Sequence, residues 1–189
     1  MKAIMVNAPP SICEKVANGD CTILVKKSMP KIDAPFKCYL YCMKAKTIGD
    51  IILCKSEENA KLFGYNTVKG INKGFAENED IKLKSKVIGE FICDRLIQYN
   101  CDRDFQEYFV AGYLGAYMPL REMYLTQKDL MEYGKGETLY GWHISNLTIY
   151  DEPKELTEFF TPIGKRPSYM LERPFSSWGY VEEKEDKDK

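Results

Sequence analysis

The chain has 189 residues, 44% hydrophobic and 13% aromatic, and this composition excludes a chain that is disordered throughout. Its net charge of −1 excludes a polycation that binds nucleic acid through charge alone. No run approaches the roughly 18 consecutive apolar residues of a membrane span. The N-terminus reaches the polar Asn7 after a short apolar stretch, so we expect a first strand there and no signal peptide. We therefore expect a cytoplasmic protein that makes no membrane contact.

The first half of the chain predicts one helix between strands. Residues 9–19 are expected to form a short helix, because proline is tolerated in the first helical turn and Gly19 fits the left-handed position that ends it. Apolar, β-branched runs over 21–27, 36–43 and 86–99 predict strands. The polar stretch at about 55–85 has glycines and little periodicity, so we expect a long insertion there.

The second half predicts an aromatic, irregular insertion at about 100–125 and then a helix over 126–133. Thr126 is a natural N-cap, and Asp129 lies at the favourable end of the helix dipole. Residues 142–150 alternate apolar and polar side chains, the period of a half-buried strand, and 178–181 form a last strand. The sequence thus predicts one domain over 1–181, α+β and mainly β, followed by a disordered charged tail over 182–189.

The seven cysteines are predicted to be reduced and structural. Their number is odd, no pair has C-x-x-C spacing, and most lie in apolar runs, where a thiol behaves as a small hydrophobe. His143 is the only histidine, so four zinc ligands are hard to assemble. We expect no metal and no cofactor.

Several blocks of the sequence resemble the ASCH family, in particular a branch associated with phages and Firmicutes. They are the strand, helix, glycine turn and strand over 1–27, the block Lys86–Arg95, the block Tyr140–Asp151 with its Gly-Trp-His-Ile-Ser core, and the C-terminal strand. The resemblance implies a PUA-like mixed β-barrel with short flanking helices. It also implies binding of RNA or a modified nucleoside, and in some members hydrolysis of acylated cytidines.

The family motif in the turn after the first helix, G-x-K-x-x-E-x-R, is largely lost here. Gly19 matches, but Cys21 replaces the lysine, Leu24 replaces the acid, and Lys26 replaces the arginine. Leu24 can act as neither nucleophile nor base, and Cys21 cannot supply the missing cation. We expect both to pack as apolar residues, and we expect the protein not to be an enzyme.

Other polar residues remain candidates for a ligand site. Lys26 and Lys27 offer point charges for phosphate, within residues 1–50, which carry eight Lys against four Asp and Glu; two solvated lysines at a strand end explain the pattern equally well. Trp142 and His143 fall on opposite faces of their strand, so we expect Trp142 in the core and His143 as the better site residue, although a structural histidine also fits. The predicted ligand or nucleic-acid-binding residues are Gly19, Lys26, Lys27, Glu90, Arg95 and His143.

Three functions stay open at this point. The first is a non-catalytic module that binds RNA or a nucleotide-like ligand. The second is a protein-interaction factor of phage or mobile-element origin, because binding often resides in loops such as the two insertions. The third is a residual hydrolase of modified nucleosides.

Overall fold

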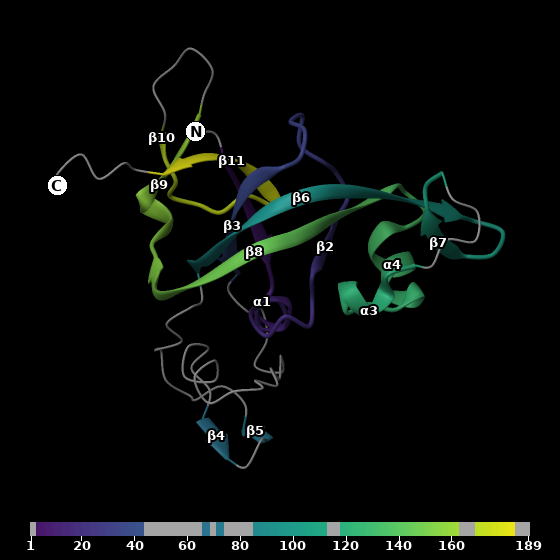
Figure 1. The fold of residues 1–189 in the computed structure, drawn as a ribbon, viewed down its shortest axis with the longest axis horizontal. Helices are drawn as coiled ribbons and strands as arrows, with labels where there is room; N and C mark the ends of the chain where they lie inside the picture. Colours follow the sequence, from purple (N-terminus) through teal and green to yellow (C-terminus); the bar gives the residue numbers. More distant parts are fainter. Residues whose placement is uncertain are drawn as a thin grey trace. The chain divides into compact units, whose positions relative to one another are not determined.

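The computed structural model describes residues 3–43, 66–68, 71–73, 85–112, 118–162 and 169–183. Contacts divide the chain into two compact units that interleave in sequence. Unit 1 comprises 1–18, 37–91 and 147–189, and unit 2 comprises 19–36 and 92–146. The longest strands, β6 (Lys86–Asp102) and β8 (Leu139–Lys154), each contribute residues to both units (Figure 1). The expected single domain over 1–181 stays a prediction.

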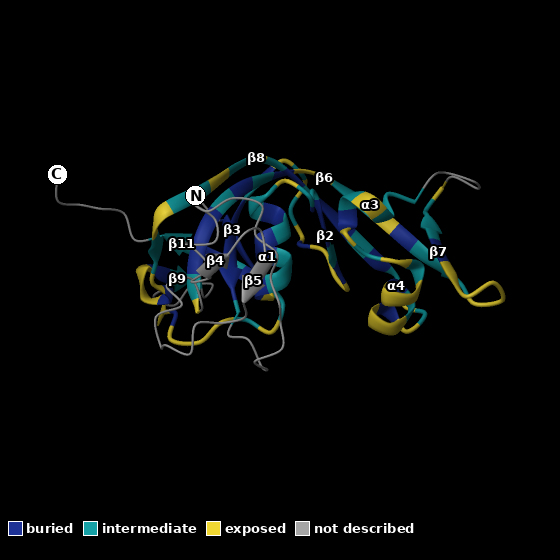
Figure 2. Cartoon of the chain, turned by 90° about the horizontal axis from the view of Figure 1, so that it is seen from below, coloured by how far each residue is buried: buried dark blue, intermediate teal, exposed yellow. Residues whose placement is uncertain are grey.

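Unit 1 is a mixed sheet with the strand order β10-β9-β11-β1-β3-β6-β8. Its strands are β1 (Ala3–Ala8), β3 (Phe36–Cys42), β9 (Phe159–Thr161), β10 (Tyr169–Met170) and β11 (Trp178–Glu183), with the first part of β6 and the last part of β8. β1 runs parallel to β3, with Ile4 opposite Cys38, and antiparallel to β11, with Ala3 opposite Val181. Every residue of β1 is buried, and Lys37 is the one half-buried residue of β3. Figure 2 shows β3 as a largely buried strand. β1 and β3 therefore form the centre of this sheet.

Among the described residues of unit 1, α1 (Pro10–Ala17) is a helix that has Pro10 in its first turn, as the sequence predicts. A 3-10 turn, η1 (Leu156–Glu158), leads into β9. A short antiparallel pair, β4 (Asn66–Val68) and β5 (Ile71–Lys73), lies within the predicted first insertion, most of which falls outside the described residues. The core of the unit joins β1, β3 and β11 to the segment after β8 through these buried residues: Ala3, Met5, Tyr39, Tyr41, Val87, Leu156, Phe159, Leu171 and Val181.

Unit 2 contains the last part of β6, β7 (Glu107–Val110), the first part of β8, and β2 (Ile23–Lys26). β2 pairs antiparallel with β8, so that Ile23 lies opposite His143, and β7 pairs antiparallel with β6. Two short helices, α3 (Leu120–Met123) and α4 (Gln127–Gly134), complete the unit. Thr126 and Asp129 form a reciprocal capping box at the start of α4, which confirms the predicted helix start.

Two close approaches in unit 2 require glycine. A Cβ on Gly141 would lie 2.6 Å from the Tyr99 hydroxyl and 2.9 Å from Ile23, and one on Gly134 would collide with the Tyr108 ring. Both tyrosines are buried in the core of the unit, with Ile23, Met123, Leu130 and Leu139. Trp142 is fully buried and meets the edge of Phe36 at 5.6 Å between ring centroids, so the expectation of a core Trp142 is confirmed.

The mainly β fold with short helices is confirmed, but the sheet does not close into the expected barrel. Within the described part of the chain, β10 and β2 are the two ends of the strand order. The start of β2 meets a helix instead of another strand, because the Thr22 amide donates to the Glu122 carbonyl of α3 at 2.8 Å.

Two expected irregular stretches are more ordered than predicted. β6 continues to Asp102, and β7 and α3 occupy much of the described part of 100–125, because Tyr108 supplies a buried anchor there. Glu182 and Glu183, assigned to the tail, belong to β11, since Glu183 bonds Tyr39 and Lys154. The rest of the expected tail lies outside the described residues.

No helix in the described ranges is long and apolar enough to cross a membrane.

Candidate functional site

In the turn after α1, the side chains at the motif positions 21 and 24 are buried. Gly19 is exposed and takes a φ of +73°, the left-handed conformation predicted for it. Cys21 is 2% exposed and Leu24 is 3% exposed. Burial raises the pKa of the Cys21 thiol to about 11, so the thiol stays protonated and is a poor nucleophile at neutral pH. The prediction that these two residues pack as apolar groups is confirmed.

The two candidate lysines after this turn differ in their exposure. Lys26 is buried at the end of β2, opposite Tyr140. Lys27 is exposed, and its ammonium lies 5.0 Å from the centre of the Tyr133 ring. Lys27 is therefore the one of the two that solvent can reach.

His143 lies on β8 opposite Ile23, and Asp94 on β6 holds its ring. The His143 Nδ1 and the Asp94 Oδ1 are 2.6 Å apart. A carboxylate accepts hydrogen bonds, so this contact selects the tautomer with the proton on Nδ1 and leaves Nε2 as an acceptor. The side chains are 21% and 41% exposed, so solvent reaches the pair. Sequence reasoning missed Asp94, because its partner is 49 positions away along the chain.

Arg95 and two buried polar groups lie in the same unit. The Tyr99 hydroxyl and the Glu122 Oε2 are buried, and neither has a hydrogen-bond partner among the described residues. Burial raises the pKa of Tyr99, while Arg95 lowers it and Glu122 raises it. Both charges therefore act on the Tyr99 hydroxyl, and Arg95 itself is exposed. We call the two groups together, the Asp94–His143 pair and the set Arg95, Tyr99 and Glu122, the unit 2 cluster, although none of the described contacts joins one group to the other.

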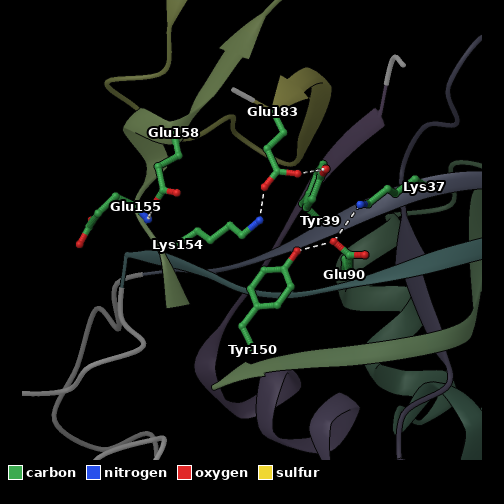
Figure 3. Close-up of polar contacts among 8 residues, drawn as sticks. All are labelled: Lys37, Tyr39, Glu90, Tyr150, Lys154, Glu155, Glu158 and Glu183. Carbon is green, nitrogen blue, oxygen red and sulfur yellow. Dashed lines mark hydrogen bonds and ion pairs between the residues drawn. The ribbon is translucent and has the colours of Figure 1, made fainter. Parts of the chain in front are cut away.

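Glu90 belongs to a different polar group, which lies entirely in unit 1 and which we call the carboxylate ring (Figure 3). The Glu90 Oε2 accepts from Lys37 at 2.8 Å and from the Tyr150 hydroxyl at 2.5 Å. The Glu183 Oε2 accepts from the Tyr39 hydroxyl at 2.6 Å, and its Oε1 accepts from Lys154. The ring thus comprises Lys37, Tyr39, Glu90, Tyr150, Lys154 and Glu183.

Cation–π contacts close the ring. The Lys37 ammonium lies 4.7 Å from the centre of the Tyr39 ring, and the Lys154 ammonium lies 4.9 Å from that of Tyr150. Each lysine therefore covers the tyrosine that is bonded to the other carboxylate. Two cations, two anions and two hydroxyls alternate, and the charges cancel.

The electrostatics of the ring hold both carboxylates in the ionised form. Burial raises the pKa of Glu90, but the hydrogen bonds from Lys37 and Tyr150 outweigh it, so the pKa is lowered. Burial acts against Glu183 in the same way, and Lys154 and Tyr39 again lower its pKa. The pKa values of the two tyrosines are raised, by burial first and then by the carboxylates. Each carboxylate of the ring is therefore stabilised by one lysine and one tyrosine.

Neither group resembles a metal centre. Among the described residues, no three His, Cys, Asp or Glu side chains are grouped so that they could hold a metal ion. The six described cysteines, which include Cys21 and Cys93, are all free thiols, as the sequence predicts.

Known proteins that are similar to the chain are found among solved structures. No family model matches the chain, and no curated protein matches it. The chain is similar to the crystal structure of ASCH from Zymomonas mobilis, with 11% identity and a TM-score of 0.48, covering 95% of this chain and 87% of that one. A point mutant of the Zymomonas mobilis protein is similar with 11% identity and a TM-score of 0.47, covering 82% and 77%. These are structures of the family that the sequence blocks resemble.

The predicted site residues thus separate into two groups. Gly19, Lys26, Lys27, Arg95 and His143 lie in unit 2, and Glu90 lies in the carboxylate ring of unit 1.

Proposed function

We propose that the chain is a non-catalytic, ASCH-type module that binds RNA or a nucleotide-like ligand, and that the unit 2 cluster is its binding site. The observation that carries the proposal is the unused hydrogen-bonding capacity of this cluster. Buried polar groups in folded proteins nearly always have partners, so those without one call for an explanation. Here Tyr99 and Glu122 each have an unpartnered buried oxygen, and the charge of Arg95, which acts on the Tyr99 hydroxyl, is exposed.

Each exposed group of the cluster suits one part of a nucleotide. The planar guanidinium of Arg95 can donate two parallel hydrogen bonds to a phosphate. His143, held by Asp94, presents Nε2 as an acceptor for an amino group of a base or for a ribose hydroxyl. Tyr99 and Glu122 have unmet hydrogen bonds that a polar group of the ligand, or a water bound with it, would satisfy.

The charge balance favours a short ligand over a long polyanion. The whole chain carries −1, and the cluster itself offers one permanent cation, Arg95. Each phosphate that the protein neutralises on a single strand contributes about −0.7 to the slope of log affinity against log salt. A site with one or two phosphate contacts should therefore show a slope of about −1 and weak binding at physiological salt.

The packing of the motif turn supports the proposal that the module is non-catalytic. Cys21 and Leu24 are buried where the family places charged groups, and the Cys21 thiol is protonated. We therefore expect N4-acetylcytidine to remain intact when it is incubated with the protein. The appearance of free cytidine would show that a hydrolase survives.

Fluorescence anisotropy with a labelled, mixed-sequence single-stranded RNA tests the binding proposal. At low salt we expect saturable binding that nucleoside monophosphates displace. Arg95→Met should weaken binding about tenfold, which corresponds to 1.4 kcal/mol. Arg103→Met is the matched control, because Arg103 is also exposed and lies outside the cluster, and it should bind like the wild type. The proposal fails if no affinity appears at low salt, or if the two variants lose affinity equally.

A further inference from the structure

A second surface of unit 2 carries an unusual feature, the tip of the hairpin between β6 and β7. Phe105 is 78% exposed there, the most exposed large hydrophobic side chain in the described part of the chain. A phenyl ring with this exposure gains little stability from burial in the fold. Exposed aromatic residues of this kind are the typical anchors of protein interfaces.

The turn holds Phe105 in one place. Asp102 ends β6, and its Oδ1 accepts from the amides of Asp104 at 3.0 Å and Phe105 at 3.2 Å. Gln106 then takes a φ of +54°, which reverses the chain into β7. An aspartate that bonds the amides two and three residues ahead stiffens a turn. The phenyl ring therefore stands on an ordered backbone.

The strand below the tip is anchored from its other side. The Gln127 side chain of α4 makes two bonds to the backbone of Tyr108, accepting from its amide and donating to its carbonyl, each at 2.9 Å. It thereby fills a place on β7 that a further strand would take. The buried Tyr108 hydroxyl donates to the Glu137 carbonyl at 2.7 Å. The hairpin is preorganised, and preorganisation lowers the entropic cost of binding.

The charges beside Phe105 indicate what kind of partner fits. Asp104 and Glu107 are exposed, and Asp102 is half-exposed. The one cation at the tip, Arg103, lies against Gly136, where a Cβ would be 3.3 Å from its Nε. The tip is therefore acidic, and it repels the phosphates of nucleic acids and of anionic lipid surfaces.

We propose that Phe105 anchors this protein to a protein partner that has an apolar pocket with a basic rim. The phenyl ring enters the pocket, and Asp104 and Glu107 face the basic residues around it. This function is separate from nucleotide binding, because it uses none of the residues of the unit 2 cluster. A binding module with such an anchor can deliver its ligand to a second protein.

Affinity capture with three matched baits tests the proposal. The baits are the wild-type protein, Phe105→Ser, and the charge reversal Asp104→Lys with Glu107→Lys, each immobilised and exposed to a nuclease-treated bacterial lysate. Tyr169→Ser is the control, because Tyr169 is another exposed aromatic residue, 56% exposed, and lies in unit 1. Circular dichroism confirms that each bait is folded.

The expected result is a protein that the wild type and Tyr169→Ser retain and that Phe105→Ser and the charge reversal lose. Rebinding of the purified partner should then fall at least tenfold with Phe105→Ser. The proposal is overturned if every captured protein binds Phe105→Ser as well as it binds the wild type, or if the charge reversal binds more tightly. It is also overturned if the Phe105-dependent ligand is nucleic acid, which an untreated lysate reveals, or a second copy of this chain, which size-exclusion chromatography reveals.

Discussion

The carboxylate ring of unit 1 and the polar cluster of unit 2 contain similar groups, but the groups of the ring are all paired and those of the cluster are paired only in part. Both combine carboxylates, tyrosine hydroxyl and cationic groups, and most of these residues lie on β6 and β8 or on strands beside them, while Glu122 lies in α3. In the ring, each hydroxyl donates to a carboxylate, and each lysine is paired with one. In the cluster, Tyr99 and Glu122 keep buried oxygens without partners, and Arg95 is exposed.

This difference distinguishes polar groups that stabilise the fold from polar groups that are available to a ligand. A polar group that is paired within the chain has already used its hydrogen bonds in folding, so little remains for a ligand. An unpaired buried group costs about 1–3 kcal/mol of stability, and a fold keeps it more readily where a ligand can recover that cost. On this view Glu90, which the sequence predicts as a ligand-binding residue, serves the sheet of unit 1, and the cluster of unit 2 serves binding.

The largest expected effect comes from restoring the family motif. Cys21→Lys with Leu24→Glu places two charges at positions that are 2% and 3% exposed. Each buried ion costs several kcal/mol unless it is well paired, so we expect the double variant not to fold. Circular dichroism during heating measures this, with exposed Lys27→Glu as a control that should shift the melting temperature little. A folded double variant that cleaves N4-acetylcytidine would instead show that the turn retains a working pocket.

A matched pair of Tyr→Phe variants probes the comparison directly. Tyr39→Phe removes a hydrogen bond to an ionised carboxylate and should lower the free energy of unfolding by about 1.5–3 kcal/mol. Tyr99→Phe removes a buried hydroxyl that has no partner, so the free energy of unfolding should stay the same or rise. Urea denaturation measures both values. Equal losses in the two variants would remove the distinction between the ring and the cluster.

A smaller expected effect is the loss of stability that the ring causes as the pH falls. The pKa values of Glu90 and Glu183 are lowered below their ordinary value of 4.5, so the folded state favours their ionised forms. Their contribution to stability is therefore complete above the unfolded pKa and is lost as the pH falls through the lower folded values. Urea denaturation between neutral and acid pH should show a weaker decline for Glu183→Gln than for the wild type.

Glu182→Gln serves as the control for this titration. Glu182 is the neighbour of Glu183 on β11, and it lies opposite Phe160 of β9. Its variant should follow the wild-type pH dependence. If the free energy of unfolding of Glu182→Gln and Glu183→Gln falls equally with pH, the ring does not hold its carboxylates ionised.

The sequence predicts those parts of the fold that depend on neighbours along the chain. The α4 capping box follows from Thr126 and Asp129, three residues apart, and the positive φ of Gly19 follows from the end of one helix. The burial of Trp142 follows from alternation within one strand. Each of these features is encoded within a few positions, where a local pattern is informative.

The two polar groups depend on long-range pairs that no local pattern encodes. His143 meets Asp94 across 49 positions, and Tyr39 meets Glu183 across 144. The alternation of apolar and polar side chains also does not predict the whole course of β8, since Asn146 takes a φ of +48° within that strand. Asparagine is one of the few residues that adopts this conformation readily, but its presence in a strand does not predict it. The sequence therefore named His143 and Arg95 without their surroundings.

The most direct test is a nuclear magnetic resonance titration of the isotope-labelled protein with a nucleoside monophosphate at low salt. If the cluster binds the ligand, backbone amide shifts should change at residues 94–99 of β6, around Glu122 and around His143. The amide chemical shifts of Lys37, Tyr39, Tyr150 and Glu183 should not change, because the polar groups of the ring already bond one another. Chemical-shift changes at the residues of the ring, with none at the residues of the cluster, would contradict the assignment of function to unit 2.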